Sequence, residues 1–379
     1  MAQFKVAGKD VQVHGFFQQG FAVSSGNNFL TMKTTNGSFS MTDGGFNVAT
    51  RLTPKLRVGA QVFSRNIGDI ANGKVALDWA FADYKFNDYF GIRAGRVKTV
   101  LGLFNDTQDM EFIHTFALLP QSMYPTDLRA STISHDGGDI YGDISLKKAG
   151  RISYVAYMGM VPYDPRGGYS IGTRDSNTPI DRFTSWAKGG DVRWATPLSG
   201  LTVGYSVLGG GGHGDARLTA LFGQPMPGRG LPYRFENLVT LSHQFYGDYQ
   251  RGAFRTFAEY RMSDSKTALL GIPIPTFVTT TEAWYVAGTY RLHPKLEVGS
   301  YYNSFIYNRN QPFSPTNGIR GPVVSARFDL NRLWNVKVEQ HFMDGYSSPL
   351  AFRSFYPSTN PTGFEKRTNA FIIRTGVTF

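Results

Sequence analysis

The sequence has no cysteine among its 379 residues, which excludes disulfide bonds and thiolate metal sites. It also has no run of about 18 apolar residues, so it encodes no transmembrane helix. Apolar residues recur at helical spacing almost nowhere along the chain. These absences exclude disulfide-stapled and helical membrane architectures, and they leave strands as the main element to look for.

The first ten residues, MAQFKVAGKD, lack the charged and apolar regions of a secretory signal peptide. Two interpretations follow: a cytoplasmic protein, or a mature chain whose signal has been removed. We favour the second, because a cysteine-free chain suits passage through the periplasm, and because of the strand pattern described next.

Polar and apolar residues alternate with a period of two along most of the chain, as in Phe254–Met262 and Val336–Met343. Most of the segments run about 9–13 residues, the length that a tilted strand needs to cross a bilayer. The mean hydropathy of −0.25 fits a membrane barrel, because only every second residue of such a strand meets lipid. The pattern predicts about sixteen strands, near residues 10–22, 46–53, 57–67, 75–86, 89–101, 139–148, 151–163, 187–197, 201–209, 236–248, 252–265, 281–292, 296–308, 321–330, 335–345 and 367–379.

The connections between these strands alternate between short and long. Short turns on one rim and long loops on the other are typical of an outer-membrane barrel, and an even strand number places both termini at the periplasmic turns. A β-propeller would repeat a blade motif of about 40 residues, which we do not find. A β-sandwich of this size would need linkers between several domains. The fold class is therefore all-β: residues 1–379 form a single transmembrane antiparallel β-barrel, with short periplasmic turns and long extracellular loops at 23–45, 102–138, 164–186, 210–235 and 346–366.

The chain ends in TNAFIIRTGVTF, with apolar residues on one face and Phe379 last. This ending resembles the terminal strand of Gram-negative outer-membrane porins, whose assembly machinery reads a C-terminal aromatic residue. Gly95–Asp106, GRVKTVLGLFND, is similar to the strand and loop opening of phosphate-selective and related porins. In sixteen-stranded porins, the loop after strand five resembles residues 102–138 in length and folds inward as a constriction. The resemblance implies a homotrimer in the bacterial outer membrane, in contact with outer-membrane lipid and lipopolysaccharide and assembled through Phe379.

Charged residues within strands are assigned to the lumen, because a Lys or Arg facing lipid near the midplane costs about 2–4 kcal/mol. Acids on the same face are fewer, and the chain has a formal net charge of +11. Charged walls select ions by sign, so we expect a water-filled channel that prefers anions. The predicted pore-lining residues are Arg51, Arg57, Arg65, Arg96, Lys98, Arg193, Arg255, Arg261, Arg291, Arg327, Lys337 and Arg374.

In the strand predicted at 89–101, no single register places all three basic residues inside, because Arg93 falls on the opposite face from Arg96 and Lys98. Either a bulge at Gly91 or Gly95 brings all three inside, or one of them lies at a rim or subunit contact.

The 102–138 segment has an acidic character of its own and contains the apolar run Met110–Pro120. We expect it to tuck into the barrel, with its acids facing a basic wall that includes Arg96 and Lys98; the alternative is an exposed surface loop. Its predicted constriction residues are Asp106, Asp109, Glu111, Asp127 and Arg129.

Nothing in the sequence predicts an enzyme, a metal site or a bound cofactor. The seven histidines form no HExxH motif, and no GxSxG elbow is present. We place His135 and His213 in loops, and we interpret the glycine run Gly209–Asp215 as a flexible loop. Lys and Arg are spread over the strands without a basic run, so nucleic-acid binding is not expected.

Three functions remain open at this point. The first is a porin for passive diffusion of small hydrophilic solutes with an anion preference. The second is a substrate-specific uptake channel for phosphate or organic anions. The third is a barrel sheath that holds a periplasmic electron-transfer partner, which would require a lumen without a constricting loop.

Overall fold

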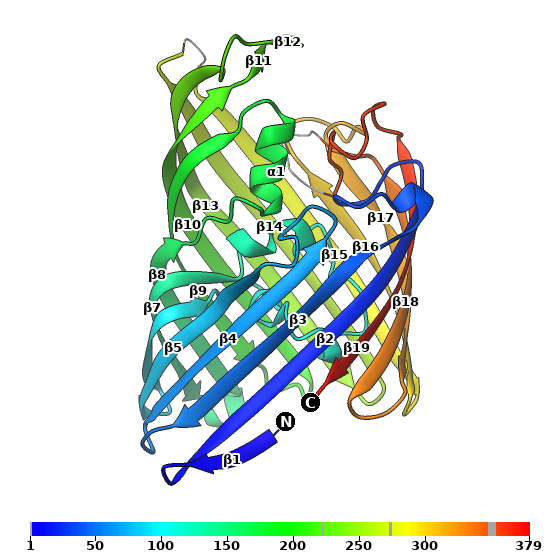
Figure 1. Cartoon of the computed structure of the whole chain (residues 1–379). Coiled ribbons are helices and arrows are strands. Elements are labelled where there is room, and N and C mark those ends of the chain that lie inside the picture. Colours follow the sequence, from blue (N-terminus) through cyan, green and yellow to red (C-terminus); the bar gives the residue numbers. More distant parts are fainter. Residues whose placement is uncertain (1, 222, 273–274, 348–353) are drawn as a thin grey trace.

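The computed structural model describes residues 2–221, 223–272, 275–347 and 354–379, and it consists almost entirely of antiparallel strands (Figure 1). Sixteen of them form a closed barrel, as predicted. The barrel strands are β2 (Lys9–Ser25), β3 (Ser38–Arg51), β4 (Leu56–Ile67), β5 (Val75–Asn87), β6 (Phe90–Lys98), β7 (Ser134–Ser145), β8 (Arg151–Val161), β9 (Ile180–Ala195), β10 (Leu201–Leu218), β13 (Leu231–Arg251), β14 (Phe254–Leu270), β15 (Phe277–His293), β16 (Leu296–Ile306), β17 (Gly318–Asp329), β18 (Trp334–Asp344) and β19 (Arg367–Thr378).

Helical elements and accessory strands are few. Among the described residues, no helix is both long and apolar enough to span a membrane. The only α-helix in that part of the chain is α1 (Gly168–Asp175). The remaining elements are the strands β1 (Ala2–Val6), β11 (Ala220–Leu221) and β12 (Gln224–Pro225), and the 3-10 turns η1 (Thr34–Asn36), η2 (Asn105–Thr107), η3 (Glu111–Ile113), η4 (Thr126–Ser131) and η5 (Lys147–Ala149).

The barrel closes where β19 pairs with β2. Phe379 exchanges backbone hydrogen bonds with Gly15, at 3.0 and 3.2 Å. Beyond the end of β19, the first residues of β2 pair instead with β1, a strand that the sequence pattern did not predict. Both ends of the chain therefore lie at the same rim, next to the short turns (Figure 1).

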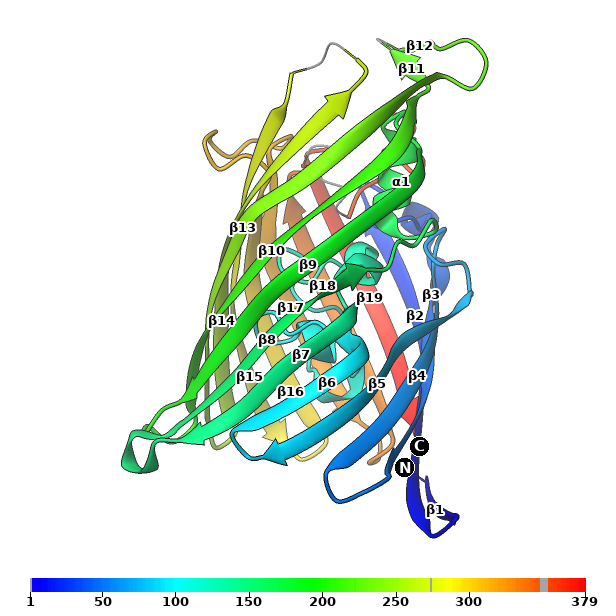
Figure 2. The same cartoon turned by 90° about the vertical axis from the view of Figure 1, so that its left-hand side faces the viewer.

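Short turns and long connections lie at opposite rims, as the sequence predicted. The wall is uneven in height: β6 has 9 residues, whereas β13 has 21, and the side formed by β10, β13 and β14 rises furthest (Figure 2). The predicted long loops 23–45, 164–186 and 210–235 are too long, because hydrogen-bonded strands continue into them. Gly209–Asp215 is not a flexible loop: it lies within β10 and pairs with both neighbouring strands.

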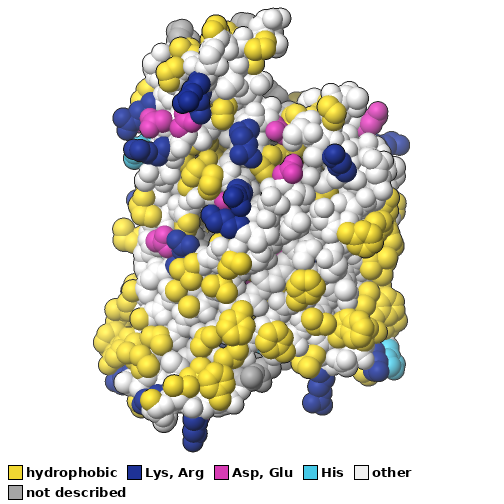
Figure 3. Space-filling view, in the orientation of Figure 1, with side chains coloured by type: hydrophobic (Ala, Val, Ile, Leu, Met, Phe, Trp, Pro, Cys, Tyr) yellow, Lys and Arg dark blue, Asp and Glu magenta, His cyan; other side chains and the backbone are white. Residues whose placement is uncertain are grey.

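Alternation along the strands separates an outward apolar face from an inward one. In β15, Val286 and Tyr290 are 53% and 48% exposed, whereas Tyr285 and Ala287 are buried. Outward apolar side chains form a broad yellow belt over the lower part of the face seen in Figure 3. An apolar outer band is what a barrel surrounded by lipid requires.

The interior holds two apolar clusters rather than an empty lumen. In the first, Phe104, Phe116 and Tyr124 of the 99–133 connection pack against the inner face of β14–β17. In the second, the 26–37 connection, α1 and Phe355 pack against the inner faces of β2–β4, β18 and β19. Connections from the long-loop rim therefore fill much of the upper barrel.

Candidate functional site

The connection between β6 and β7, residues 99–133, runs inside the ring of strands (Figures 1 and 2). Two buried wall carboxylates accept hydrogen bonds from its backbone amides. Glu339 accepts from the amides of Ala117 and Leu118, at 2.8 and 3.2 Å. Glu259 accepts from the Leu103 amide at 3.1 Å and from a tyrosine hydroxyl of the connection at 2.6 Å. These four hydrogen bonds hold the connection at defined points on the wall.

Cations of the wall hold the same connection through its backbone. Seven of the twelve predicted pore-lining residues donate to one of its carbonyl oxygens: Arg65, Lys98, Arg193, Arg261, Arg327, Lys337 and Arg374. A carbonyl oxygen satisfies a donor but does not cancel a full positive charge. These contacts therefore fix the position of the connection. Four of the seven cations also lie in ion pairs, which lowers the basic character of the wall: Lys98, Arg193, Arg327 and Arg374.

Three of these cations form a continuous row across neighbouring strands. Arg327 on β17 lies opposite Lys337 on β18, and Lys337 lies opposite Arg374 on β19. They donate to three carbonyls between residues 114 and 117, at 3.2, 3.1 and 2.9 Å. Like charges directly opposite each other are destabilising in a sheet, so this arrangement needs compensation. The carbonyls and the ion pair of Arg374 with Asp43 provide part of it.

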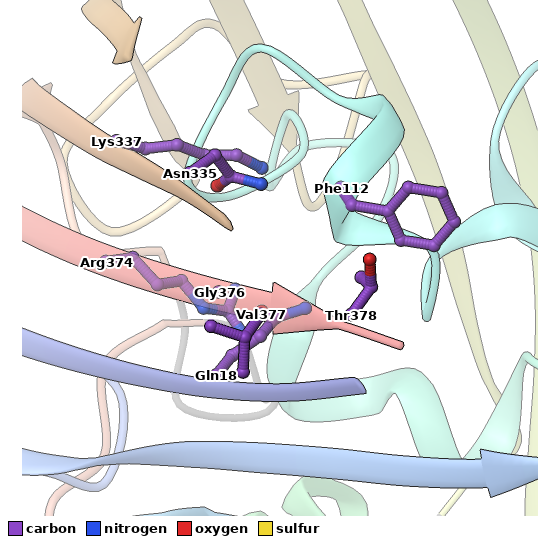
Figure 4. A pocket seen from close by; sticks show the side chains of 8 residues that line it. All are labelled: Gln18, Phe112, Asn335, Lys337, Arg374, Gly376, Val377 and Thr378. Carbon is purple, nitrogen blue, oxygen red and sulfur yellow. The ribbon is translucent and has the colours of Figure 1, made fainter. Parts of the chain in front are cut away.

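A narrow crevice with a cavity volume of about 10 Å³ opens beside this row (Figure 4). Lys337 and Asn335 line it from β18, and Arg374 lines it from β19. Gln18 lies below them on β2, and Phe112 of the inward connection faces them across the gap (Figure 4). The crevice thus combines two cations and two amides with one aromatic ring, which are groups that can bind an anion.

Other predicted wall arginines lie in ion pairs. Arg193 contacts Asp191 at 2.9 Å. Arg291 contacts Glu297 and, at 3.0 Å, Asp329. Arg255 binds both carboxylate oxygens of Asp248, at 2.8 and 2.9 Å. These pairs neutralise much of the basic excess that the sequence places inside the barrel.

Two predicted residues lie at the short-turn rim. Arg51 and Arg57 pair across the β3–β4 hairpin, and both are exposed. The Arg57 guanidinium lies 5.8 Å from the centre of the Phe81 ring. They therefore belong to the mouth of the barrel, away from the cationic row.

The predicted position of Arg96 is wrong. It pairs with Ala80 and Asp136, and Asp136 in turn lies opposite Met160, which is 44% exposed on the outer face. Arg96 therefore lies with Asp136 on the outer side of the wall and binds it at 2.6 Å, whereas Lys98, which has the same parity, turns inward to Asp109. Arg93, which has the opposite parity, binds the buried Asp139 at 2.9 Å.

The predicted constriction residues lie in the 99–133 connection, but most of them are tied to other groups. Asp109 binds Lys98 at 2.6 Å, and although burial opposes ionisation, Lys98 and Arg129 hold the pKa of Asp109 below its usual value. Burial raises the pKa of Asp106. Asp127 accepts from the Tyr356 hydroxyl at 2.7 Å, which connects the inward connection to the last long one.

Arg129 is the most deeply anchored of them. Its guanidinium makes two hydrogen bonds to the buried Asp78 on β5, at 2.8 and 2.9 Å, and lies 4.1 Å from the Phe63 ring centre. Glu111 opens the turn η3.

The histidines lie in structural positions. His135 is in β7 rather than in a loop, where it stacks on Tyr157 and contacts the Thr99 hydroxyl at 3.0 Å. His213 is in β10, also contrary to prediction. Burial lowers the pKa of His114 to about 3. Within the described residues, no group of three or more potential metal ligands is placed to hold an ion.

The sequence did not identify the aromatic packing inside the barrel. Phe116 packs edge-on against Tyr301, with ring centres 4.8 Å apart, and Phe104 does so against Phe257 at 5.3 Å. The apolar run Met110–Pro120 was one signal, because it needs a surface to pack on. The second was the inward parity of large aromatic residues on β14–β16.

Comparison with known proteins gives the fold but little sequence similarity. No protein-family model matches the chain. An uncharacterized protein of Aquifex aeolicus is 31% identical over 91 residues, which are 24% of this chain and 19% of that protein. This chain thus spans about a fifth of the length of that curated relative.

Solved structures match over the whole chain. The outer-membrane expressed OmpT of Vibrio cholerae has a TM-score of 0.60 at 13% identity, covering 100% of both chains. The outer membrane channel DcaP of Acinetobacter baumannii has 0.57 at 12%, also over 100% of both. An anion-selective porin from Comamonas acidovorans has 0.57 at 10%, covering 98% of this chain and 100% of that one. The predicted sixteen-stranded fold of Gram-negative outer-membrane porins is therefore confirmed.

Proposed function

We propose that this porin-fold barrel is an outer-membrane channel for passive diffusion of small hydrophilic solutes, with a preference for anions. The observation that carries the proposal is the row of Arg327, Lys337 and Arg374 beside the inward connection. Charged pore walls select ions by sign. Arg327 and Arg374 lie in ion pairs with Asp329 and Asp43, as several other wall arginines do with their own partners, so the preference is moderate.

In this proposal the 102–138 segment constricts the pore. Its contacts run from Asp78 on β5 through Glu259 on β14 to Glu339 on β18, so it is attached on several sides of the wall. An inward segment attached in this way sets an upper size limit for solutes. Three of the cations that hold its carbonyls, Arg65, Lys337 and Arg374, are buried, so in this proposal they act on passing ions through the electric field of the wall.

A substrate-specific uptake channel for phosphate or organic anions is the second candidate. The crevice beside the row favours it, because Lys337 and Arg374 lie next to Phe112 there; its cavity of about 10 Å³ must widen before a carboxylate or phosphate can enter. Saturable, phosphate-blockable conductance would distinguish this function from a general pore. The sheath alternative is disfavoured, because it needs a lumen that the 99–133 connection occupies.

The assembly proposal follows from the fold. We place the protein in the bacterial outer membrane as a homotrimer in contact with lipid and lipopolysaccharide, with both termini in the periplasm. Phe379 follows β19, the strand that closes the barrel, and its side chain is 53% exposed. The barrel-assembly machinery could recognise it there. We propose no enzymatic activity and no cofactor.

Single-channel recording in planar bilayers tests the function. We expect discrete conductance steps from purified protein, and Lys337→Gln should lower the anion-to-cation permeability ratio. Protein that is folded and inserted but produces no conductance steps would contradict the proposal.

A further inference from the structure

Exposed cations surround the rim that carries the short turns. Lys55, Lys148, Arg251, Lys295 and Arg332 each lie in or beside the turn of a different hairpin, and all are exposed. Because successive hairpins follow one another around a closed barrel, these charges are distributed around the rim rather than gathered in one pocket. In Figure 3, dark blue and cyan side chains extend from the lower edge of this face without magenta neighbours, whereas both signs mix near the top.

Outward apolar residues adjoin these cations on the same rim. Leu52 precedes Lys55 in its turn, and Leu292 precedes Lys295; they are 40% and 58% exposed. Trp334, which is 44% exposed, follows Arg332, and its indole N–H binds the Thr375 hydroxyl at 2.7 Å. Aromatic and apolar residues at a barrel rim mark the boundary between hydrocarbon and head groups. The cations therefore lie at the level of the head groups.

Long basic side chains at such a boundary pack their stems along apolar surface and extend the charged end to the polar layer. We infer that the short-turn rim binds the phosphate groups of anionic phospholipids in the surrounding leaflet. The spacing of the cations favours many lipid head groups over one small anion, because no two of these turns converge on a closed pocket. This role is separate from solute passage, since the residues lie on turns outside the lumen.

The experiment compares two variants that lose the same charge. The rim variant is Lys55→Gln/Lys148→Gln/Lys295→Gln/Arg332→Gln. The control is Lys33→Gln/Lys74→Gln/Arg229→Gln/Lys366→Gln, which removes four exposed cations at the opposite rim. Full-length protein is placed in nanodiscs of phosphatidylcholine, with or without one quarter phosphatidylglycerol, and the lipids that it retains are measured by native mass spectrometry.

Wild type and control should retain phosphatidylglycerol in preference to phosphatidylcholine. In the rim variant, the ratio of retained phosphatidylglycerol to phosphatidylcholine should fall roughly fivefold for each neutralised cation that lies near a lipid. Equal retention by the rim variant and wild type would overturn the inference, as would an equal loss in the control. Displacement of the lipid by inorganic phosphate, beyond that by chloride at the same ionic strength, would assign the rim to a soluble phosphate instead. If the fourfold rim variant does not fold, Lys55→Gln/Arg332→Gln gives the same test with a smaller expected loss.

Discussion

Replacing Arg129 by Gln tests whether the inward connection controls the pore. Arg129 and Asp78 are both buried, with side chains 7% and 4% exposed, and they share two hydrogen bonds of 2.8 and 2.9 Å. Removing one partner of a buried pair leaves an uncompensated charge and costs about 3–5 kcal/mol. If that loss falls on the attachment of the connection, its detached state becomes about 10²- to 4 × 10³-fold more populated, since each 1.4 kcal/mol is about tenfold.

The assay is single-channel recording in planar bilayers, with mean conductance and open-channel noise as readouts. Arg129→Gln should raise both, because a partly detached connection blocks less of the lumen and moves more. Asp78→Asn/Arg129→Gln should recover part of the wild-type behaviour, because no buried charge is left unpaired. Arg217→Gln, in a partly exposed pair with Asp181 at the long-loop rim, should change little because this pair does not involve the inward connection. Wild-type conductance and noise in folded Arg129→Gln would refute the reasoning.

Four further results are expected. Deletion of residues 108–125 should raise single-channel conductance, and an unchanged value would mean that the segment does not constrict the pore. Lys337→Gln should shift the reversal potential toward the cation side, whereas no shift would exclude the cationic row as the selectivity element. Because the folded-state pKa of Asp109 lies below the ordinary aspartate pKa near 3.8, its ion pair stabilises the connection fully at pH values above 3.8. This stabilisation is lost only as the pH falls through the lower folded pKa. Protection of the connection from proteolysis should therefore stay constant from pH 8 to about pH 5 and decline only in stronger acid. Val286→Arg on the lipid face should lower the free energy of unfolding by about 2–4 kcal/mol in urea titrations, and Leu292→Arg near the rim should lower it by about 0–1 kcal/mol. Equal effects of the two substitutions would contradict the placement of Val286 in the hydrocarbon layer and Leu292 at its edge.

The barrel could be predicted from the sequence because its constraints are local. A strand that faces lipid on one side must alternate, and Val286, Tyr290 and their counterparts carry that signal in every hairpin. The alternation weakens between the apolar outer band and the long-loop rim. There the glycine-rich part of β10 continues as a paired strand without apolar residues on one face. For this reason the strand ends near the long loops were misplaced.

The interior was harder to predict because it depends on which residues converge in space. Parity alone could place Lys337 and Arg374 inside, but only the register of β17–β19 aligns them with Arg327. Parity also indicated the conflict between Arg93 and Arg96 without deciding it. Pairing with Asp136 and Asp139 decides it, because Arg96 lies beside the outward Asp136 whereas Arg93 binds the buried Asp139.

The central claim is that the cationic row gives the pore a preference for anions. The most direct measurement is the reversal potential of the wild-type channel in planar bilayers under a KCl gradient. We predict the sign of an anion-selective pore, with a moderate magnitude because two cations of the row, Arg327 and Arg374, and several other wall arginines lie in ion pairs. A reversal potential of the opposite sign, showing cation selectivity, would contradict the account.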